Sequence, residues 1–110
     1  CLGCQALGEY FGAELYNLEE VHHGVQTSIY IVDHSVLFAG LPNSIEVGRY
    51  HSWALNTKSA KSLLTTSSDA SGVLMSFRHK HLPIFGVQFH PESIMTSQGV
   101  ALIENWIHNK

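Results

Sequence analysis

Hydrophobic positions recur at helical spacing near both ends of the chain, whereas the middle carries short apolar runs broken by turn-forming residues. The helically spaced positions are Leu7, Tyr10 and Phe11 in the first segment and Val100, Ile103, Trp106 and Ile107 in the second. Each set places its apolar side chains on one side of a helix, which predicts a helix over residues 5–11 and another from about residue 98. Gly12 follows the first segment and is typical of a helix end.

The stretch between these helices is typical of β-strands. Its runs are rich in β-branched and aromatic residues, which favour extended structure. The predicted strands cover residues 27–32, 45–50, 62–67, 73–77 and 84–89. Turn-forming residues separate them, and Pro91 prevents the last strand from continuing. The chain has no repeat, low-complexity tract or linker, so the pattern predicts one compact piece of mixed α and β structure.

Composition limits the class of protein. The chain has 110 residues, which is one domain or part of one. Hydrophobic residues make up 45% and charged residues 14%, which argues against disorder. With 6 Lys and Arg against 9 Asp and Glu, the net charge is -3, so nucleic acid is a poor candidate partner. No apolar run approaches the ~18–20 residues of a membrane span, and we expect no membrane partner.

Cysteine usage indicates a reducing compartment. The chain has only two cysteines, which cannot form a disulfide framework and suit the cytoplasm. The first is residue 1, with no initiator Met before it. We therefore expect the numbering to start at a processed end or inside a longer chain.

Cys1 is a candidate nucleophile. It precedes the first predicted helix, where unpaired N–H groups and the helix dipole stabilise a thiolate, and Gly3 lets the backbone approach a substrate closely. A single cysteine is more often inert core. Cys1 and Cys4 could also be half of a zinc site or a redox pair, although the chain has no third Cys, no suitably spaced His pair and no thioredoxin-like context.

A second candidate lies in residues 86–92, GVQFHPE, where a buried-type strand ends and delivers His90 and Glu92. Ligands bind at such strand ends in open α/β sheets. The stiff spacing across Pro91 lets a carboxylate hold the imidazole in one tautomer, as in a nucleophile, base and orienter triad. A capped turn is the ordinary alternative, but cysteine catalysis needs a base distant in sequence, which His90 supplies.

A third element, residues 49–53 (RYHSW), is ambiguous by chemistry alone. Ser52 and its backbone could hold a polar substrate, or the segment could be an ordinary strand end. The His22-His23-Gly24 segment is weaker, because solvated loop histidines are the default there.

Taken together, these motifs resemble those of class I (triad-type) glutamine amidotransferases. Residues 1–5 match the end of the family's G-[IV]-C-L-G-x-Q motif, and residues 86–92 match G-V-Q-F-H-P-E in full. Residues 49–52 and the His23-Gly24 pair are similar to the branch that contains the glutaminase subunits of anthranilate synthase and aminodeoxychorismate synthase. The resemblance covers essentially all 110 residues.

The resemblance implies a role for each matching residue. Cys1 would be the nucleophile, His90 the general base and acid, and Glu92 the group that orients His90. The implied glutamine-binding residues are Leu2 (an oxyanion N–H), Gln5, Ser52 and Trp53. Cys4 and Trp53 stand where His or Met and Leu are common in the family. No metal or cofactor is implied for the glutaminase reaction.

The resemblance also implies a fold and a partner. We expect an α/β, flavodoxin-like three-layer fold with a mostly parallel sheet that lacks its N-terminal strands, so that residues 1–110 are the C-terminal part of a single domain. L-Glutamine would be the substrate, and a chorismate-using synthase subunit would receive the ammonia. Two alternatives remain: a catalytically inactive fragment or interaction module, and an N-terminal-nucleophile amidohydrolase whose base is the Cys1 amine.

Overall fold

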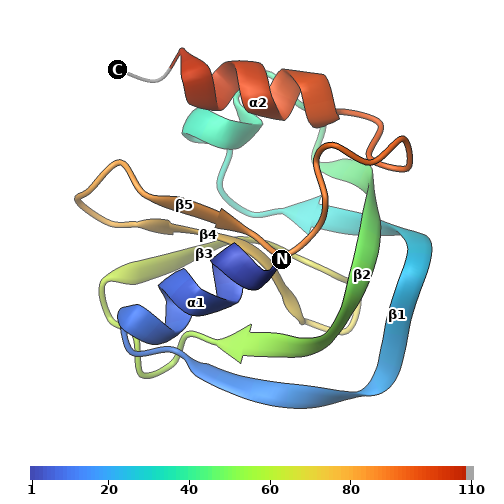
Figure 1. Ribbon diagram of the computed structural model, residues 1–110. Coiled ribbons are helices and arrows are strands. Elements are labelled where there is room, and N and C mark those ends of the chain that lie inside the picture. The colour runs from blue at the N-terminus through green and yellow to red at the C-terminus, as the bar shows by residue number, and fades with distance from the viewer. Residues whose placement is uncertain (109–110) are drawn as a thin grey trace.

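The computed structural model describes residues 1–108. Two helices and a short 3-10 helix surround one sheet (Figure 1). The helices are α1 (Leu2–Tyr10), η1 (Val36–Phe38) and α2 (Gly99–Ile107). The strands are β1 (Glu14–Ile31), β2 (Ser44–Asn56), β3 (Leu63–Ser68), β4 (Leu74–His79) and β5 (Phe85–Val87).

Both predicted helices and all five predicted strands are present. The first helix begins earlier than predicted, at Leu2, and it ends before Gly12, which has a φ of 96°. The strand predicted over residues 27–32 is only the last part of β1, and β2 continues well beyond residue 50. The last strand is shorter than predicted, because β5 ends at Val87.

The strand order is β2-β1-β3-β4-β5. The expected mostly parallel pairing is wrong for residues 1–108, because each of the four neighbouring pairs is antiparallel. Short connections explain this for β3–β4 and β4–β5, because a parallel pair needs a crossover connection of about a dozen or more residues.

The long β1–β2 pair bends sharply (Figure 1). The register between the two strands shifts between Asn17 and His22 and again between His23 and Val25. Gly24, at the second shift, has a φ of 66°. Such bulges bend a strand and increase its twist, so the middle of β2 is turned toward the start of α1 and the end of β5.

Two hydrophobic clusters hold the helices to the sheet. The first joins η1 and α2 to the sheet, and the second lies beneath α1. The buried residues are Ile29, Ile31, Leu37, Phe38, Ile45, Val47, Met75, Phe89 and Leu102 in the first cluster, and Cys4, Ala13, Leu55, Ala60, Leu63, Leu74 and Phe77 in the second. The neighbouring residues Leu74 and Met75 of β4 enter different clusters, as expected for the two faces of a strand.

The start of α2 is packed directly against the segment that follows β5. A Cβ atom on Gly99 would lie 2.0 Å from the carbonyl oxygen of Pro91. Only glycine therefore allows this approach, and the backbone next to His90 depends on it.

We predict that Gly99→Ala lowers the free energy of unfolding of the full-length gene product by about 1–3 kcal/mol, because the methyl group must displace backbone. Gly3→Ala is the matched control, since a Cβ atom there meets nothing within 4 Å. That control should keep or raise the stability, by up to about 1 kcal/mol. Urea denaturation measures both variants, and equal stabilities would contradict the packing argument.

Candidate active site

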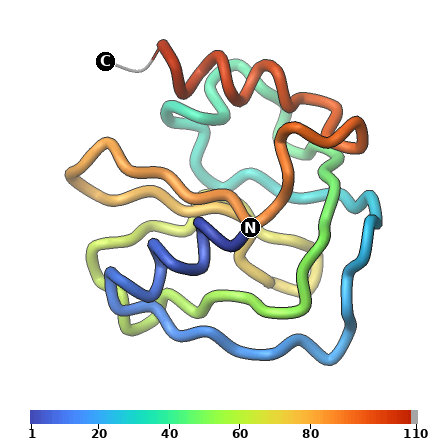
Figure 2. Tube along the Cα trace, in the orientation of Figure 1, coloured from blue at the N-terminus to red at the C-terminus, as the bar shows by residue number. Residues whose placement is uncertain are grey.

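Cys1 lies at the N-terminus of α1, beside the end of β5 (Figure 2). Its backbone nitrogen donates to the carbonyl of Val87 at 3.1 Å, and its carbonyl accepts from Gln5 N at 3.1 Å. No side chain caps the helix, and its first turn holds no acidic residue. The N–H groups of that turn, Leu2 among them, therefore point toward the region of Cys1, where they favour negative charge.

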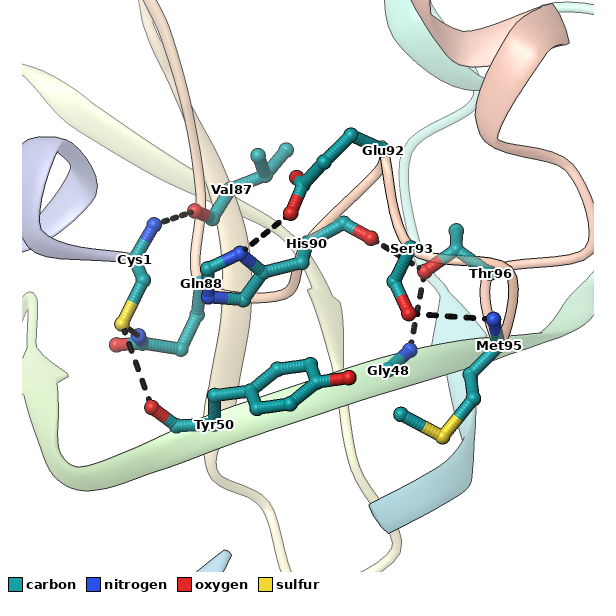
Figure 3. A network of polar contacts seen from close by, with 10 residues as sticks. All are labelled: Cys1, Gly48, Tyr50, Val87, Gln88, His90, Glu92, Ser93, Met95 and Thr96. Atoms are coloured by element: carbon teal, nitrogen blue, oxygen red, sulfur yellow. Dashed lines mark hydrogen bonds and ion pairs between the residues drawn. The ribbon is translucent and has the colours of Figure 1, made fainter. Parts of the chain in front are cut away.

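The sulfur of Cys1 has two polar neighbours (Figure 3). The side-chain nitrogen of Gln88 donates to Sγ at 3.4 Å, and Sγ lies 3.8 Å from the carbonyl oxygen of Tyr50. The thiol is half-buried and reachable from a cleft of about 630 Å³. The cleft is lined by Cys1, Leu2, Tyr50, His90, Glu92 and Ser93.

His90 and Glu92 form a pair at the edge of the same cleft. The Nδ1 atom of His90 lies 2.9 Å from Oε2 of Glu92 (Figure 3). Nε2 of His90 is buried and has no hydrogen-bond partner among residues 1–108. The ring of Tyr50 meets the His90 ring edge-on, with centroids 4.9 Å apart. The imidazole is therefore held through Nδ1, and Nε2 is left for another group.

Burial alone would raise the pKa of Glu92, but hydrogen bonds from its own backbone N–H and from His90 hold that pKa below its usual value. The carboxylate is therefore ionised at neutral pH, and its exposure to solvent also favours the ionised form. An ionised carboxylate on Nδ1 favours the tautomer that carries its proton there, which leaves Nε2 of His90 able to accept a proton.

The backbone of His90 is anchored at both its polar atoms. Its N–H donates to the carbonyl of Gly48 at 3.1 Å, and its carbonyl accepts from Oγ1 of Thr96 at 2.6 Å. The same hydroxyl oxygen accepts the N–H of Gly48 at 3.0 Å. The loop after β5 is thereby fastened to β2.

A buried chain of polar groups lies on the other side of Cys1. Arg49 is 1% exposed; Nη1 pairs with Asp69 at 2.9 Å and Nε donates to Nε2 of His51 at 3.0 Å. Because arginine can only donate, the proton of His51 is on Nδ1, which donates to the carbonyl of Trp53 at 2.8 Å. Burial, reinforced by the Arg49 charge and opposed by the bond to Trp53, lowers the pKa of His51 to about 4.

The predicted glutamine-binding residues fall in different places. Leu2 lines the cleft, whereas Gln5 and Trp53 are joined by a hydrogen bond of 3.1 Å from Gln5 Nε2 to the Trp53 carbonyl. Ser52 is partly buried in β2 between His51 and Trp53, and it is not among the residues that line the cleft. The structure thus brings Cys1, Leu2, His90 and Glu92 to one cleft, with Gln5 and Trp53 linked behind it.

Three neighbours of the site received no role from the sequence. Tyr50 and Gln88 lie inside the motifs at residues 49–53 and 86–92. The sequence therefore placed them near the site but did not indicate their contacts with Cys1. Asp69 lies in the β3–β4 turn, 20 residues from its partner Arg49, and no local pattern points to it.

The second cysteine takes no part in the cleft. Burial raises the pKa of Cys4 to about 12, so its thiol stays protonated and unreactive at neutral pH. Over residues 1–108, no group of three or more His, Cys, Asp or Glu side chains is placed to hold a metal ion. None of the helices that the structure describes is long and apolar enough to cross a membrane.

An apolar groove beside α2 is a weaker candidate site. It is lined by Leu37, Phe85, Val87, Pro91, Leu102, Ile103 and Trp106. None of these side chains can transfer a proton or act as a nucleophile, so this groove is not a candidate for catalysis.

Comparison with known proteins agrees with these motifs. A family model described as glutamine amidotransferase class-I matches residues 1–110. Anthranilate synthase component 2 of Mycobacterium tuberculosis is 44% identical over 97% of this chain and 46% of its own length. Aminodeoxychorismate/anthranilate synthase component 2 of Bacillus subtilis is 42% identical over 97% of this chain and 55% of its own length. The chain therefore spans about half the length of these curated relatives.

Solved structures show the same fold. A "putative gmp synthase subunit a protein" from Thermoplasma acidophilum aligns with a TM-score of 0.89 and 29% identity, over 97% of this chain and 53% of that one. A glutamine amidotransferase from Thermotoga maritima aligns with a TM-score of 0.73 and 20% identity, over 97% of this chain and 43% of that one. The α/β fold expected from the sequence resemblance is thus confirmed.

We predict that His51 makes stability depend on pH. Its folded-state pKa of about 4 lies below the ordinary value of 6.5, so between these values only the unfolded chain takes up the proton. This contribution to stability is complete above pH 6.5 and is lost as the pH falls toward 4. In the full-length gene product, the free energy of unfolding of the His51→Gln variant should fall by on the order of 3 kcal/mol less than that of wild type over this pH range.

Urea denaturation at pH 4, 5, 6 and 7 measures this difference between wild type and variant. His108→Gln at the exposed end of α2 is the matched control and should keep the wild-type pH dependence. A His51→Gln variant whose stability falls as steeply as that of wild type would contradict the assignment of a neutral, buried His51.

Proposed function

Because the chain belongs to the class-I glutamine amidotransferase family, we propose that it provides the catalytic centre of a glutaminase that hydrolyses the side-chain amide of L-glutamine. The observation that carries this proposal is the cleft, which is lined both by Cys1 at a helix N-terminus and by His90, whose Nε2 has no partner among residues 1–108. Glu92 on Nδ1 completes the order of nucleophile, base and orienting carboxylate.

In the first half of the proposed reaction, Nε2 of His90 takes the thiol proton of Cys1, and the thiolate attacks the amide carbonyl carbon. The carbonyl oxygen becomes an oxyanion, which the N–H of Leu2 at the start of α1 would stabilise. The C–N bond then breaks, and His90 returns its proton to the leaving nitrogen, which departs as ammonia. A glutamyl thioester remains on Cys1.

In the second half, water attacks the thioester while His90 accepts a proton from it. The C–S bond breaks, glutamate leaves, and the sulfur regains its proton from His90. The net change is glutamine plus water to glutamate plus ammonia, so the thiol, the imidazole and the carboxylate suffice, and no step requires a metal or a cofactor. Gln5, Ser52 and Trp53 are proposed to hold the amino-acid end of the substrate.

The contacts of Cys1 favour His90 as the base over the Cys1 backbone nitrogen. That nitrogen donates to the Val87 carbonyl at 3.1 Å, so it is engaged away from the sulfur. An N-terminal-nucleophile mechanism would need the same nitrogen to take up the thiol proton, and it would leave the His90–Glu92 pair without a task.

The proposed recipient of the ammonia is a synthase subunit that acts on chorismate. Support comes from the relatives, which are named as second components of anthranilate and aminodeoxychorismate/anthranilate synthases. Ammonia made in the cleft would be used by that partner in place of free ammonia. The choice between an anthranilate and an aminodeoxychorismate product depends on the partner.

We predict that Cys1→Ser and His90→Ala in the full-length gene product, assayed with its synthase partner, abolish glutamine-dependent synthesis and leave ammonia-dependent synthesis intact. Loss of general acid–base catalysis alone costs ~10²–10⁴ in rate. The measurement is product formation with glutamine or with ammonium chloride as nitrogen donor. His108→Ala is the matched control for His90→Ala, and glutamine-dependent turnover at the wild-type rate in either site variant would disprove the triad.

A further inference from the structure

Gln88 is the polar residue most deeply enclosed beside the nucleophile. It follows β5 directly and is 0% exposed, and its side chain lies between Cys1 and Gln5. Its nitrogen donates to Sγ of Cys1 at 3.4 Å, and its oxygen accepts from Gln5 Nε2 at 3.2 Å. Both ends of the buried amide are therefore occupied, one of them by the sulfur.

The neighbours of Gln88 determine which end of its side-chain amide is the nitrogen and which is the oxygen. The carbonyl of Trp53 can only accept, so the Gln5 atom 3.1 Å from it must be the side-chain nitrogen. The same nitrogen lies 3.2 Å from the Gln88 side chain, which must therefore present its oxygen there. The other end of Gln88, which faces the sulfur, is then the N–H₂ group.

The Trp53 carbonyl also accepts a second hydrogen bond, from His51. His51 Nδ1 donates to it at 2.8 Å, and the tautomer of His51 is set by Arg49, a group that can only donate. His51 and Gln5 thus both donate to the Trp53 carbonyl, which joins the Arg49–His51 pair to the Gln5–Gln88 pair. Because that carbonyl only accepts, it fixes the direction of the bonds from Gln5 to Gln88 and from Gln88 to Sγ.

We propose that Gln88 is a catalytic residue that stabilises the thiolate of Cys1 by donating a side-chain N–H to its sulfur. The other polar neighbour of Sγ, the Tyr50 carbonyl, is an acceptor and favours the protonated thiol, so Gln88 is the side chain that favours the reactive form before substrate arrives. The inference rests on the proposed function in that it takes Cys1 as the nucleophile.

The test uses Gln88→Met in the full-length gene product. Methionine has a similar length, fills the buried space and cannot donate to Sγ. The readout is the rate of Cys1 alkylation by iodoacetamide from pH 5 to 10, located by mass spectrometry, since Cys4 is buried. Gln98→Met, at the start of α2, makes the same change where the side chain forms no capping hydrogen bond.

Loss of one hydrogen bond to a charged sulfur should raise the pH midpoint of alkylation by about one unit and slow alkylation about tenfold below that midpoint. The glutamine-dependent kcat/KM should fall by a similar factor, and Gln98→Met should behave as wild type. A midpoint equal to that of wild type in folded Gln88→Met would overturn the proposal and leave Gln88 a packing residue.

A second variant and a measurement on the wild-type protein test the proposal even if Gln88→Met folds poorly. Gln88→Glu keeps the acceptor for Gln5 and replaces the donor by a carboxylate, so the midpoint should rise further. In the unmodified protein, the side-chain ¹⁵NH₂ signal of Gln88 should shift with pH at the same midpoint as the alkylation of Cys1. A signal that does not change across that midpoint would overturn the proposal.

The two proposals fail separately. Glutamine turnover that survives Cys1→Ser would reject Cys1 as the nucleophile of the proposed glutaminase but would leave the alkylation result as it stands. An unchanged alkylation midpoint in the Gln88 variants would reject the role of Gln88, while loss of turnover in Cys1→Ser and His90→Ala would still support the glutaminase.

Discussion

The buried ion pair between Arg49 and Asp69 is the interaction on which the geometry of the cleft depends. Arg49 is 1% exposed, and a charge in such a place is tolerated only when it is paired and hydrogen-bonded. Its carboxylate partner comes from the β3–β4 turn, and its other bond goes to His51 on its own strand. The pair therefore ties the bend of β2 to the rest of the sheet and sets the tautomer of His51, which donates to the same Trp53 carbonyl as Gln5.

The cleft is held from two sides by different means. On the side of α1, the polar chain leads through Gln5 to Gln88, whose side-chain nitrogen donates to the sulfur of Cys1. On the other side, the loop that carries His90 is fastened to β2 through Thr96 and is packed against Gly99 without room for a side chain. Cys1 and His90 are thus held by separate sets of contacts that both involve β2, so the bend in that strand affects their separation.

The sequence predicts the parts of this structure that follow from local pattern. Periodicity found both helices, and composition found each strand. The sequence prediction missed most of β1. The residues from Glu14 to Gln26 are largely polar and exposed, and they are extended only because they pair with β2. The antiparallel pairing of β3, β4 and β5 follows from their short connections rather than from residue type. Cys1, His90 and Glu92 were reached through motifs, whereas the contact of Gln88 with Cys1 spans 87 positions and has no local signal.

A neutral amide beside the sulfur suits the proposed role of Cys1, whose sulfur would both attack and leave. A cation in the position of Gln88 would stabilise the thiolate more strongly, but nucleophilicity falls as the basicity of a thiolate falls. The same cation would have to be buried without a carboxylate partner, at a cost of several kcal/mol. An amide donates without either penalty, and it does not titrate. The charged Arg49 lies several hydrogen bonds away, where it is paired with Asp69 and donates to His51 rather than to the sulfur of Cys1.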